Sequence, residues 1–203
     1  MKTLFVVVVG YLLGSIPTGV LIVRRLRPEI DLRSIGSGNI GATNVSRALG
    51  ARWGAVTMLG DCAKGLVPVL FARWIGASAT AAAMAGIAAF LGHIYPIYLD
   101  MKGGKGASTA LGVFLGLAPL AALLLLFIWV CAALIAQTTA VGALSAALAL
   151  PILVIGTAPA GPFRGPAITT AILIAPFVFY THRENIRRIL RGELQAGKKA
   201  GEN

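Results

Sequence analysis

Three short polar segments carry the residue types that could bind or transform a ligand. The first is Asp31–Gly50 (DLRSIGSGNIGATNVSRALG), in which glycines alternate with small hydroxyl and amide side chains and Arg47 follows. Glycines let backbone N–H groups turn toward a ligand, and a guanidinium fork matches the geometry of a phosphate. The segment therefore predicts a phosphate-binding loop, the alternative being an ordinary linker between helices. The other candidate ligand-binding residues of this loop are Ser37, Gly38, Asn39, Gly41, Thr43 and Asn44.

The second segment is Met101–Ser108 (MKGGKGAS), which leads directly into a long uncharged stretch. Free N–H groups and the dipole at a helix N-terminus favour an anion there. The segment is not a nucleotide-binding P-loop, because that spacing and an acidic residue for magnesium are both absent. Its candidate binding residues are Lys102, Gly103, Gly104, Lys105 and Gly106. The alternative is that the two lysines only mark the cytoplasmic side.

The third segment is Tyr180–Arg191 (YTHRENIRRILR), which contains His182 and Asn185 at a spacing of three. That spacing puts both side chains on one face of a helix. Histidine titrates near neutral pH, so His182 is suited to exchange a proton or hold a substrate oxygen. The arginines of this segment are interpreted as contacts to lipid headgroups.

A fourth pair, Asp61 and Lys64, lies within an otherwise apolar stretch. Ionisable groups are costly inside a membrane and are usually paired there. Two interpretations stay open, a structural ion pair and one wall of a polar cavity.

The composition shows what must position these residues. Apolar residues make up 57% of the 203-residue chain and charged residues only 12%, and residues 106–163 contain no charge at all. About 25% charged residues is usual for a soluble domain. These values exclude a water-soluble fold, a disordered chain and a disulfide-stapled module. We predict an all-α polytopic membrane protein.

Seven transmembrane helices account for the length of the apolar stretches. Three are predicted at Thr3–Val23, Trp53–Phe71 and Ala77–Tyr95. Residues 106–181 hold either two spans or four, and four give about 19 residues each, close to the 20 that a bilayer requires. The expected breaks are Gly116–Pro119, Gln137–Ala140 and Thr157–Gly165.

Basic residues set the predicted orientation, because cytoplasmic loops are enriched in Lys and Arg. The N-terminus is expected outside and the C-terminus in the cytoplasm. Residues 1–203 would form one integral membrane domain, with functional cytoplasmic loops at about 24–52 and 96–106 and a cytoplasmic tail at about 182–203. The net charge of +11 then reflects topology and contact with anionic lipid.

Together these features predict a cytoplasm-facing pocket lined by backbone N–H groups, Arg47, Lys105 and His182 and covered by apolar helices. Such a pocket suits a ligand with a phosphate head and an apolar tail. Nucleic-acid binding is not expected, because no basic stretch interleaved with aromatic residues is present. No metal site is expected, since the two histidines are far apart and carboxylates are few.

Six motifs occur in one order along most of the chain, and with them the sequence resembles the bacterial acyl-phosphate:glycerol-3-phosphate acyltransferase family (PlsY). They are GSIPTG (Gly14–Gly19), GSGNIGATN (Gly36–Asn44) followed by Arg47, DCAKG (Asp61–Gly65), GHIYP (Gly92–Pro96), KGGKG (Lys102–Gly106) and HRENI (His182–Ile186).

The resemblance implies a seven-helix enzyme of the bacterial inner membrane with its active site facing the cytoplasm. The enzyme would transfer an acyl group from acyl phosphate to the 1-hydroxyl of sn-glycerol 3-phosphate, without a cofactor. The products would be lysophosphatidic acid and inorganic phosphate, in the first step of phospholipid synthesis. The family's functional residues fall on Ser37 and Arg47, on the 102–106 glycine loop, and on His182 and Asn185.

One segment departs from the family pattern. Relatives usually carry a TRYVSLGS-like stretch, whereas this chain has AQTTAVGA (Ala136–Ala143), which lacks the arginine and places Ala140 near the serine. Gln137 together with Thr138 or Thr139 substitutes for these groups, or substrate handling differs. The competing function is a transporter or flippase for a phosphate-bearing metabolite or lipid, which would also use cationic, glycine-rich helix ends.

Overall fold

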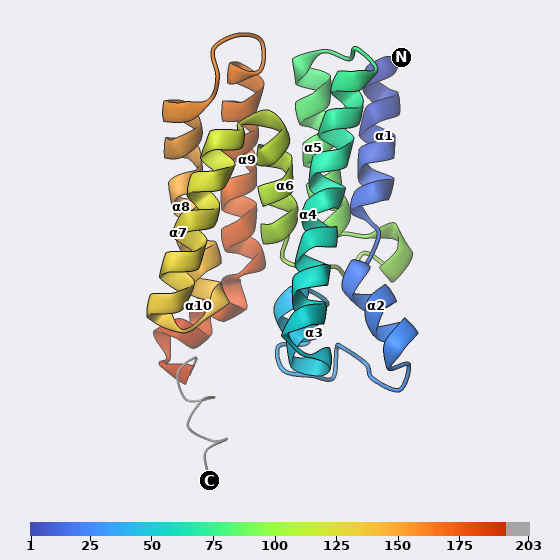
Figure 1. Cartoon of the computed structure of the whole chain (residues 1–203), viewed down its shortest axis with the longest axis vertical. Helices are drawn as coiled ribbons and strands as arrows, with labels where there is room; N and C mark the ends of the chain where they lie inside the picture. The colour runs from blue at the N-terminus through green and yellow to red at the C-terminus, as the bar shows by residue number, and fades with distance from the viewer. Residues whose placement is uncertain (194–203) are drawn as a thin grey trace.

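The computed structural model describes residues 1–193, and every regular element in that range is helical. The helices run roughly parallel to one long axis (Figure 1). The N-terminus lies at one end, while the 27–41 connection and α10 lie at the other. The all-helical class predicted from the sequence is confirmed.

The first apolar segment is not one continuous helix. It consists of α1 (Lys2–Gly14) and α2 (Thr18–Leu26), separated at Pro17. Proline has no backbone N–H and disfavours helical geometry in the residue before it. The Ile16 carbonyl left without a helical partner accepts a hydrogen bond from Lys64 Nζ, at 2.8 Å. The segment predicted at Thr3–Val23 is confirmed as one apolar stretch long enough to cross a membrane, Lys2–Leu26, but it consists of two helices and not of one.

The next elements are α3 (Ala42–Leu49), α4 (Ala51–Trp74), α5 (Ala79–Ile94) and the short 3-10 helix η1 (Ile97–Leu99). The long helices α4 and α5 confirm the segments predicted at Trp53–Phe71 and Ala77–Tyr95. Gly50, whose φ is +90°, separates α3 from α4 and lets the chain turn sharply between them.

The long uncharged stretch forms four helices, whereas the four membrane spans predicted there stay a prediction. They are α6 (Ala107–Leu117), α7 (Pro119–Ala136), α8 (Thr139–Thr157) and α9 (Arg164–Thr181), and α10 (Arg183–Leu190) follows. All three predicted breaks separate consecutive helices at Ala118, at Gln137–Thr138 and at residues 158–163.

The helices differ in whether they are long enough to span a membrane. Five segments of the described chain are long and apolar enough, and the α9–α10 pair, bent by 57°, would be a sixth. The remaining apolar helix, α6, has 11 residues and is only about 17 Å long, against the ~30 Å of a hydrocarbon core.

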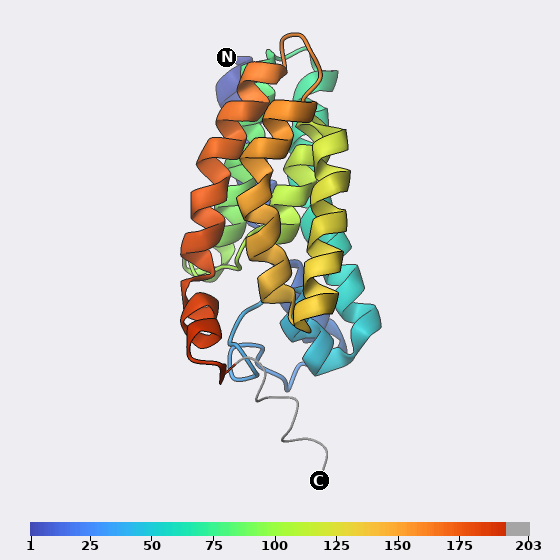
Figure 2. The same ribbon diagram turned by 90° about the vertical axis from the view of Figure 1, so that its left-hand side faces the viewer.

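Small residues allow the N-terminal helices to pack closely. A methyl group at Gly10 or Gly14 of α1 would overlap the α5 backbone at Ala85 or Ala89, and one at Gly112 of α6 would overlap the Cys62 carbonyl of α4. Such close approach is the usual device of membrane helix pairs. The helices α7, α8 and α9 form a second group beside this one (Figures 1 and 2).

Basic side chains at the end that carries the N-terminus are all bound to backbone carbonyls. Lys2 Nζ donates to Ile75 O at 2.9 Å, and Arg73 Nη1 donates to Gly116 O at 2.9 Å and lies over the Phe163 ring. Arg164 donates to the carbonyls of Ala158 and Ile155. Each of these cations thus supplies a hydrogen-bond donor to carbonyls at or near the C-terminal end of a helix.

Candidate active site

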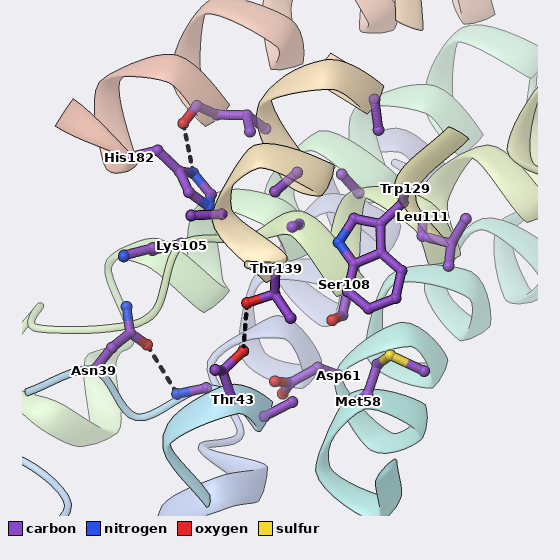
Figure 3. A pocket seen from close by; sticks show the side chains of 18 of the residues that line it. Asn39, Thr43, Met58, Asp61, Lys105, Ser108, Leu111, Trp129, Thr139 and His182 are labelled. Carbon is purple, nitrogen blue, oxygen red and sulfur yellow. Dashed lines mark hydrogen bonds between the residues drawn. The ribbon is translucent and has the colours of Figure 1, made fainter. Parts of the chain in front are cut away.

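A cavity of about 550 Å³ lies between the two helix groups, at the end opposite the N-terminus. Loop 36–41, α3, α4 and α6 line one side of it, and α7, α8, α9 and α10 line the other. In Figure 3, Asn39, Lys105 and His182 lie on one side of the pocket, and Leu111 and Trp129 on the other. The cavity therefore has a polar part and an apolar part.

The first predicted loop supplies much of the polar part. Asn39 Oδ1 accepts a hydrogen bond from the Gly41 backbone N–H at 2.8 Å, which shapes the loop just before α3. Gly36 has a φ of +54° and lies against the Arg47 side chain, which only a residue without Cβ permits. The residues of this loop and of α3 that line the cavity are Ser37, Asn39, Gly41, Thr43, Asn44 and Arg47. Gly38 is not among the lining residues, and its φ of +64° gives it a role in the turn.

The Asn44 side chain is fixed by a hydrogen bond to the backbone of the first loop. Its Nδ2 donates to the Leu32 carbonyl at 2.7 Å, and the side chain is buried. Its Oδ1 has no hydrogen-bond partner among the described residues. A buried acceptor without a partner is costly, so Asn44 Oδ1 is a candidate contact for a ligand hydroxyl.

Of the five candidate binding residues of the second segment, Lys102–Gly106, only Lys105 lines the cavity. The Gly103 and Gly104 N–H groups donate to the Ile94 and His93 carbonyls, both at 3.0 Å, and a Cβ on Gly104 would overlap the His93 ring. Gly106 has a φ of +85° and lies against Phe90. These three glycines have a clear packing role, and their role in substrate binding stays a prediction.

Lys102 lies away from the cavity and is exposed. Its carbonyl accepts a hydrogen bond from Arg33 Nη2 at 3.0 Å, which joins this segment to the first loop. Its proposed contact with substrate also stays a prediction.

The helix that follows begins at the cavity wall. Ala107 and Ser108, the first two residues of α6, both line the cavity. The N–H groups of a first helical turn have no partner within the helix and attract anions. Ser108 was not singled out from the sequence, although it ends the quoted MKGGKGAS segment.

His182 is buried at the junction of α9 and α10, with 4% of its surface exposed. Its Nδ1 lies 2.8 Å from the Val178 carbonyl. A carbonyl oxygen only accepts, so Nδ1 carries the hydrogen and Nε2 of the neutral ring is left as the acceptor. The Thr181 hydroxyl donates to the Lys105 carbonyl at 2.8 Å and joins this junction to the glycine loop. Asn185 also lines the cavity, as predicted from its spacing.

Asp61 and Lys64 form a buried ion pair, with 2.9 Å between Nζ and Oδ1. Asp61 lines the cavity and Lys64 does not. His93 Nδ1 lies 3.7 Å from the same carboxylate oxygen. Both interpretations of the pair therefore apply, since Lys64 braces the break before α2 and Asp61 reaches the cavity wall.

The segment that departs from the family pattern also reaches the cavity. Thr138, Thr139, Ala140 and Ala143 line it, and the hydroxyls of Thr139 and Thr43 are hydrogen-bonded at 3.1 Å. This bond connects α8 to α3 at the wall of the cavity.

Sequence reasoning predicted a pocket for an apolar tail but did not identify the residues of its apolar part, and it missed one of its cations. The apolar lining includes Leu111, Phe114, Leu125, Leu126, Trp129, Ala147 and Leu150. These residues are ordinary in a membrane helix, so their types carry no signal. The missed cation is Arg188 of α10, whose spacing of three from Asn185 is the one signal available.

Lys105 lies in the connection before α6, half-buried beside other cations. Burial, followed by the positive charges of Arg188 and Arg47, lowers the pKa of Lys105 from 10.5 to about 8, and Glu184 opposes this shift. The ammonium is thus charged at neutral pH but easily deprotonated.

This lowered pKa predicts that anion binding weakens as the pH rises. Below about pH 8 Lys105 is protonated and attracts an anion, and above it the attraction is lost. We expect sulfate affinity, measured by calorimetry, to fall between pH 7 and 9.5. A Lys105→Arg variant stays charged over this range and should lose the pH dependence. An equal fall in both proteins would show that Lys105 is not the titrating group.

The fold and the cavity define a class: a multi-pass membrane protein in which one cavity joins a cationic part to an apolar part. A family model described as glycerol-3-phosphate acyltransferase matches residues 4–192. The chain belongs to the glycerol-3-phosphate acyltransferase family.

Relatives in sequence and in structure agree with this assignment. Proteins named glycerol-3-phosphate acyltransferase are 47% identical in Geotalea daltonii and 48% in Geobacter sulfurreducens, each over 95% of this chain and 96% of the relative. The chain is also similar to crystal structures of PlsY, an integral membrane glycerol 3-phosphate acyltransferase. Its glycerol 3-phosphate form is 37% identical with a TM-score of 0.86, and its lysophosphatidic acid form is 36% identical with a TM-score of 0.83. Both comparisons cover 95% of this chain and 94% of PlsY.

Proposed function

We propose that this protein transfers an acyl group from acyl phosphate to the 1-hydroxyl of sn-glycerol 3-phosphate. The products are lysophosphatidic acid and inorganic phosphate, and the reaction is the first step of phospholipid synthesis. One observation carries the proposal: a single cavity joins a cationic polar part to an apolar part. Both substrates carry a phosphate, and one also carries an acyl chain, which the apolar lining suits.

The reaction needs no protein nucleophile, because phosphate is a good leaving group. The glycerol hydroxyl oxygen bonds to the acyl carbon, and the bond between that carbon and the phosphate oxygen breaks. The protein holds two anions together and stabilises the oxyanion that forms at the carbonyl. We assign catalysis to Ser37, Arg47, Lys105, His182 and Asn185. His182 Nε2 takes the hydroxyl proton in one route, and a substrate phosphate oxygen takes it in the other.

The remaining predicted residues are proposed to contribute to substrate binding, some by direct contact and others by shaping the cavity. Asn39, Gly41, Thr43, Asn44 and Asp61 line the cavity, so direct contact is open to them. Gly38, Lys64, Lys102, Gly103, Gly104 and Gly106 do not line it and would act by shaping the walls. The acyl chain is proposed to lie between helices, against the bilayer.

We further propose seven membrane crossings by a single integral membrane domain, with the N-terminus outside and the C-terminus inside. The membrane would be the bacterial inner membrane and the cavity would open to the cytoplasm. Two observations support this orientation. The N-terminus lies at the end of the bundle opposite the 27–41 connection and α10, and basic residues gather near the cavity, at the latter end. Residues 194–203 of the proposed cytoplasmic tail lie outside the described residues.

The transporter alternative has less support. Transporters usually bind their substrate near the membrane midplane, between repeated halves. In this cavity the cations gather at one end, and the lining toward the other end is apolar.

The test of the proposed function is phosphate release by the purified protein given palmitoyl phosphate and glycerol 3-phosphate. We expect release that requires both substrates and is matched by lysophosphatidic acid. Protein that is folded and binds glycerol 3-phosphate but forms no product would contradict the proposal. A liposome transport assay would then test the alternative.

A further inference from the structure

Three cations meet at the polar part of the cavity without a partner of opposite charge. Arg47 comes from α3, Lys105 from the glycine loop and Arg188 from α10, and all three line the cavity. Within residues 1–193, none of their side chains lies within 4 Å of a carboxylate oxygen or donates a hydrogen bond to a protein atom. At the opposite end of the bundle, Lys2, Arg73 and Arg164 all donate to carbonyls.

Arg188 differs sharply from its neighbour Arg187. Arg187 is exposed and pairs with Glu184, with 3.1 Å between Nη1 and Oε2. Arg188 is half-buried, lies one helical turn after Asn185 and lines the cavity with it. Two adjacent arginines of one short helix therefore have different surroundings, one in solvent with its own carboxylate and the other at the cavity.

Gathering like charges in a half-buried site is unfavourable unless an anion compensates for them. The charges of Arg188 and Arg47 both act on Lys105, so the three groups share one local field. A planar guanidinium also matches the oxygens of a phosphate in a bidentate manner. Glu184 pairs with Arg187, and its charge offsets the effect of Arg188 and Arg47 on Lys105 only in part.

We propose that Arg188 is a substrate-binding residue that holds a phosphate group together with Lys105. The inference rests on the proposed function, in which both substrates supply such a group. The phosphate is that of glycerol 3-phosphate or that of the acyl phosphate, and the two sources are separated by experiment. Arg188 thereby joins Asn185 as a second residue of α10 in the site, whereas the sequence alone suggested that the arginines of this segment contact lipid headgroups.

The experiment compares Arg188→Gln with Arg187→Gln, which remove the same charge from adjacent positions of α10. Steady-state kinetics are measured against each substrate in turn, in neutral detergent without anionic lipid. We expect the KM for one substrate to rise about tenfold or more in Arg188→Gln, as for a lost charged hydrogen bond, with a smaller change in kcat. Arg187→Gln should stay near wild type. A rise for glycerol 3-phosphate or for palmitoyl phosphate identifies the source of the phosphate.

Two further measurements separate this inference from a structural role and from the proposed function. Arg188→Lys keeps the charge and should recover part of the lost affinity. Inorganic phosphate should raise the unfolding temperature of wild type and Arg187→Gln more than that of Arg188→Gln, a readout that needs no catalysis. The inference is overturned if Arg188→Gln matches Arg187→Gln in both KM values and in the phosphate effect. It is also overturned if the sole effect of Arg188→Gln is a lower unfolding temperature in the absence of phosphate.

Discussion

Replacing Arg47 by alanine is expected to reduce phosphate release that depends on glycerol 3-phosphate by roughly 100-fold or more, as for the loss of a preorganised donor to a developing charge. Arg47 projects from α3 into the polar part of the cavity, and Gly36 packs against its side chain. Within the described chain its guanidinium has no carboxylate partner. Alanine therefore removes a ligand contact without leaving a carboxylate unpaired. The measurement is the phosphate-release assay with both substrates present.

Arg52→Ala is the matched control for this variant. Arg52 is exposed on the same end of the molecule, lies 5.6 Å from the centre of the Trp53 ring and does not line the cavity. It should keep nearly the full rate. Similar losses in both variants would point to a general effect of surface charge and would argue against a specific role for Arg47.

A His182→Gln variant is expected to lose about 10²- to 10⁴-fold in kcat, the usual contribution of a positioned general base. Glutamine retains a hydrogen-bonding side chain of similar size but cannot accept the hydroxyl proton near neutral pH. The bond from Nδ1 to the Val178 carbonyl leaves Nε2 as the acceptor, which is the state that a base requires. The KM for glycerol 3-phosphate should change much less than kcat.

The result for His182 distinguishes two chemical routes. Near-full rates in the glutamine variant would exclude His182 as the base and favour a substrate phosphate oxygen in that role. A loss confined to KM would make His182 a positioning residue. The unfolding temperature of the variant must match wild type, because His182 is buried and a misfolded protein would imitate the loss of a base.

Much of the architecture was predictable from local patterns. The absence of charge over residues 106–163 indicated membrane helices, and the breaks near Pro119, Gln137 and Gly161 could be found from turn-forming residues and segment length. The break at Pro17 was missed because the whole segment around it is long and apolar enough to cross a membrane as one span. Glycine-rich segments with Arg47, Lys105 and His182 could be singled out, because their residue types are rare in such a composition.

The amino-acid order alone therefore specified the helical membrane class, the approximate positions of the long helices and the main polar residues that face the cavity. It named Lys105 as a pocket residue but gave no reason why Lys102, three residues earlier, differs from it, and it did not distinguish Arg188 from Arg187. Those differences follow from packing between distant segments, such as the hydrogen bonds from Thr181 to Lys105 and between Thr43 and Thr139. A side chain's residue type limits which contacts it can make, but the neighbouring helices determine where it points. For that reason the apolar part of the cavity, built from ordinary leucine, alanine and aromatic residues of four helices, became visible only in the folded chain.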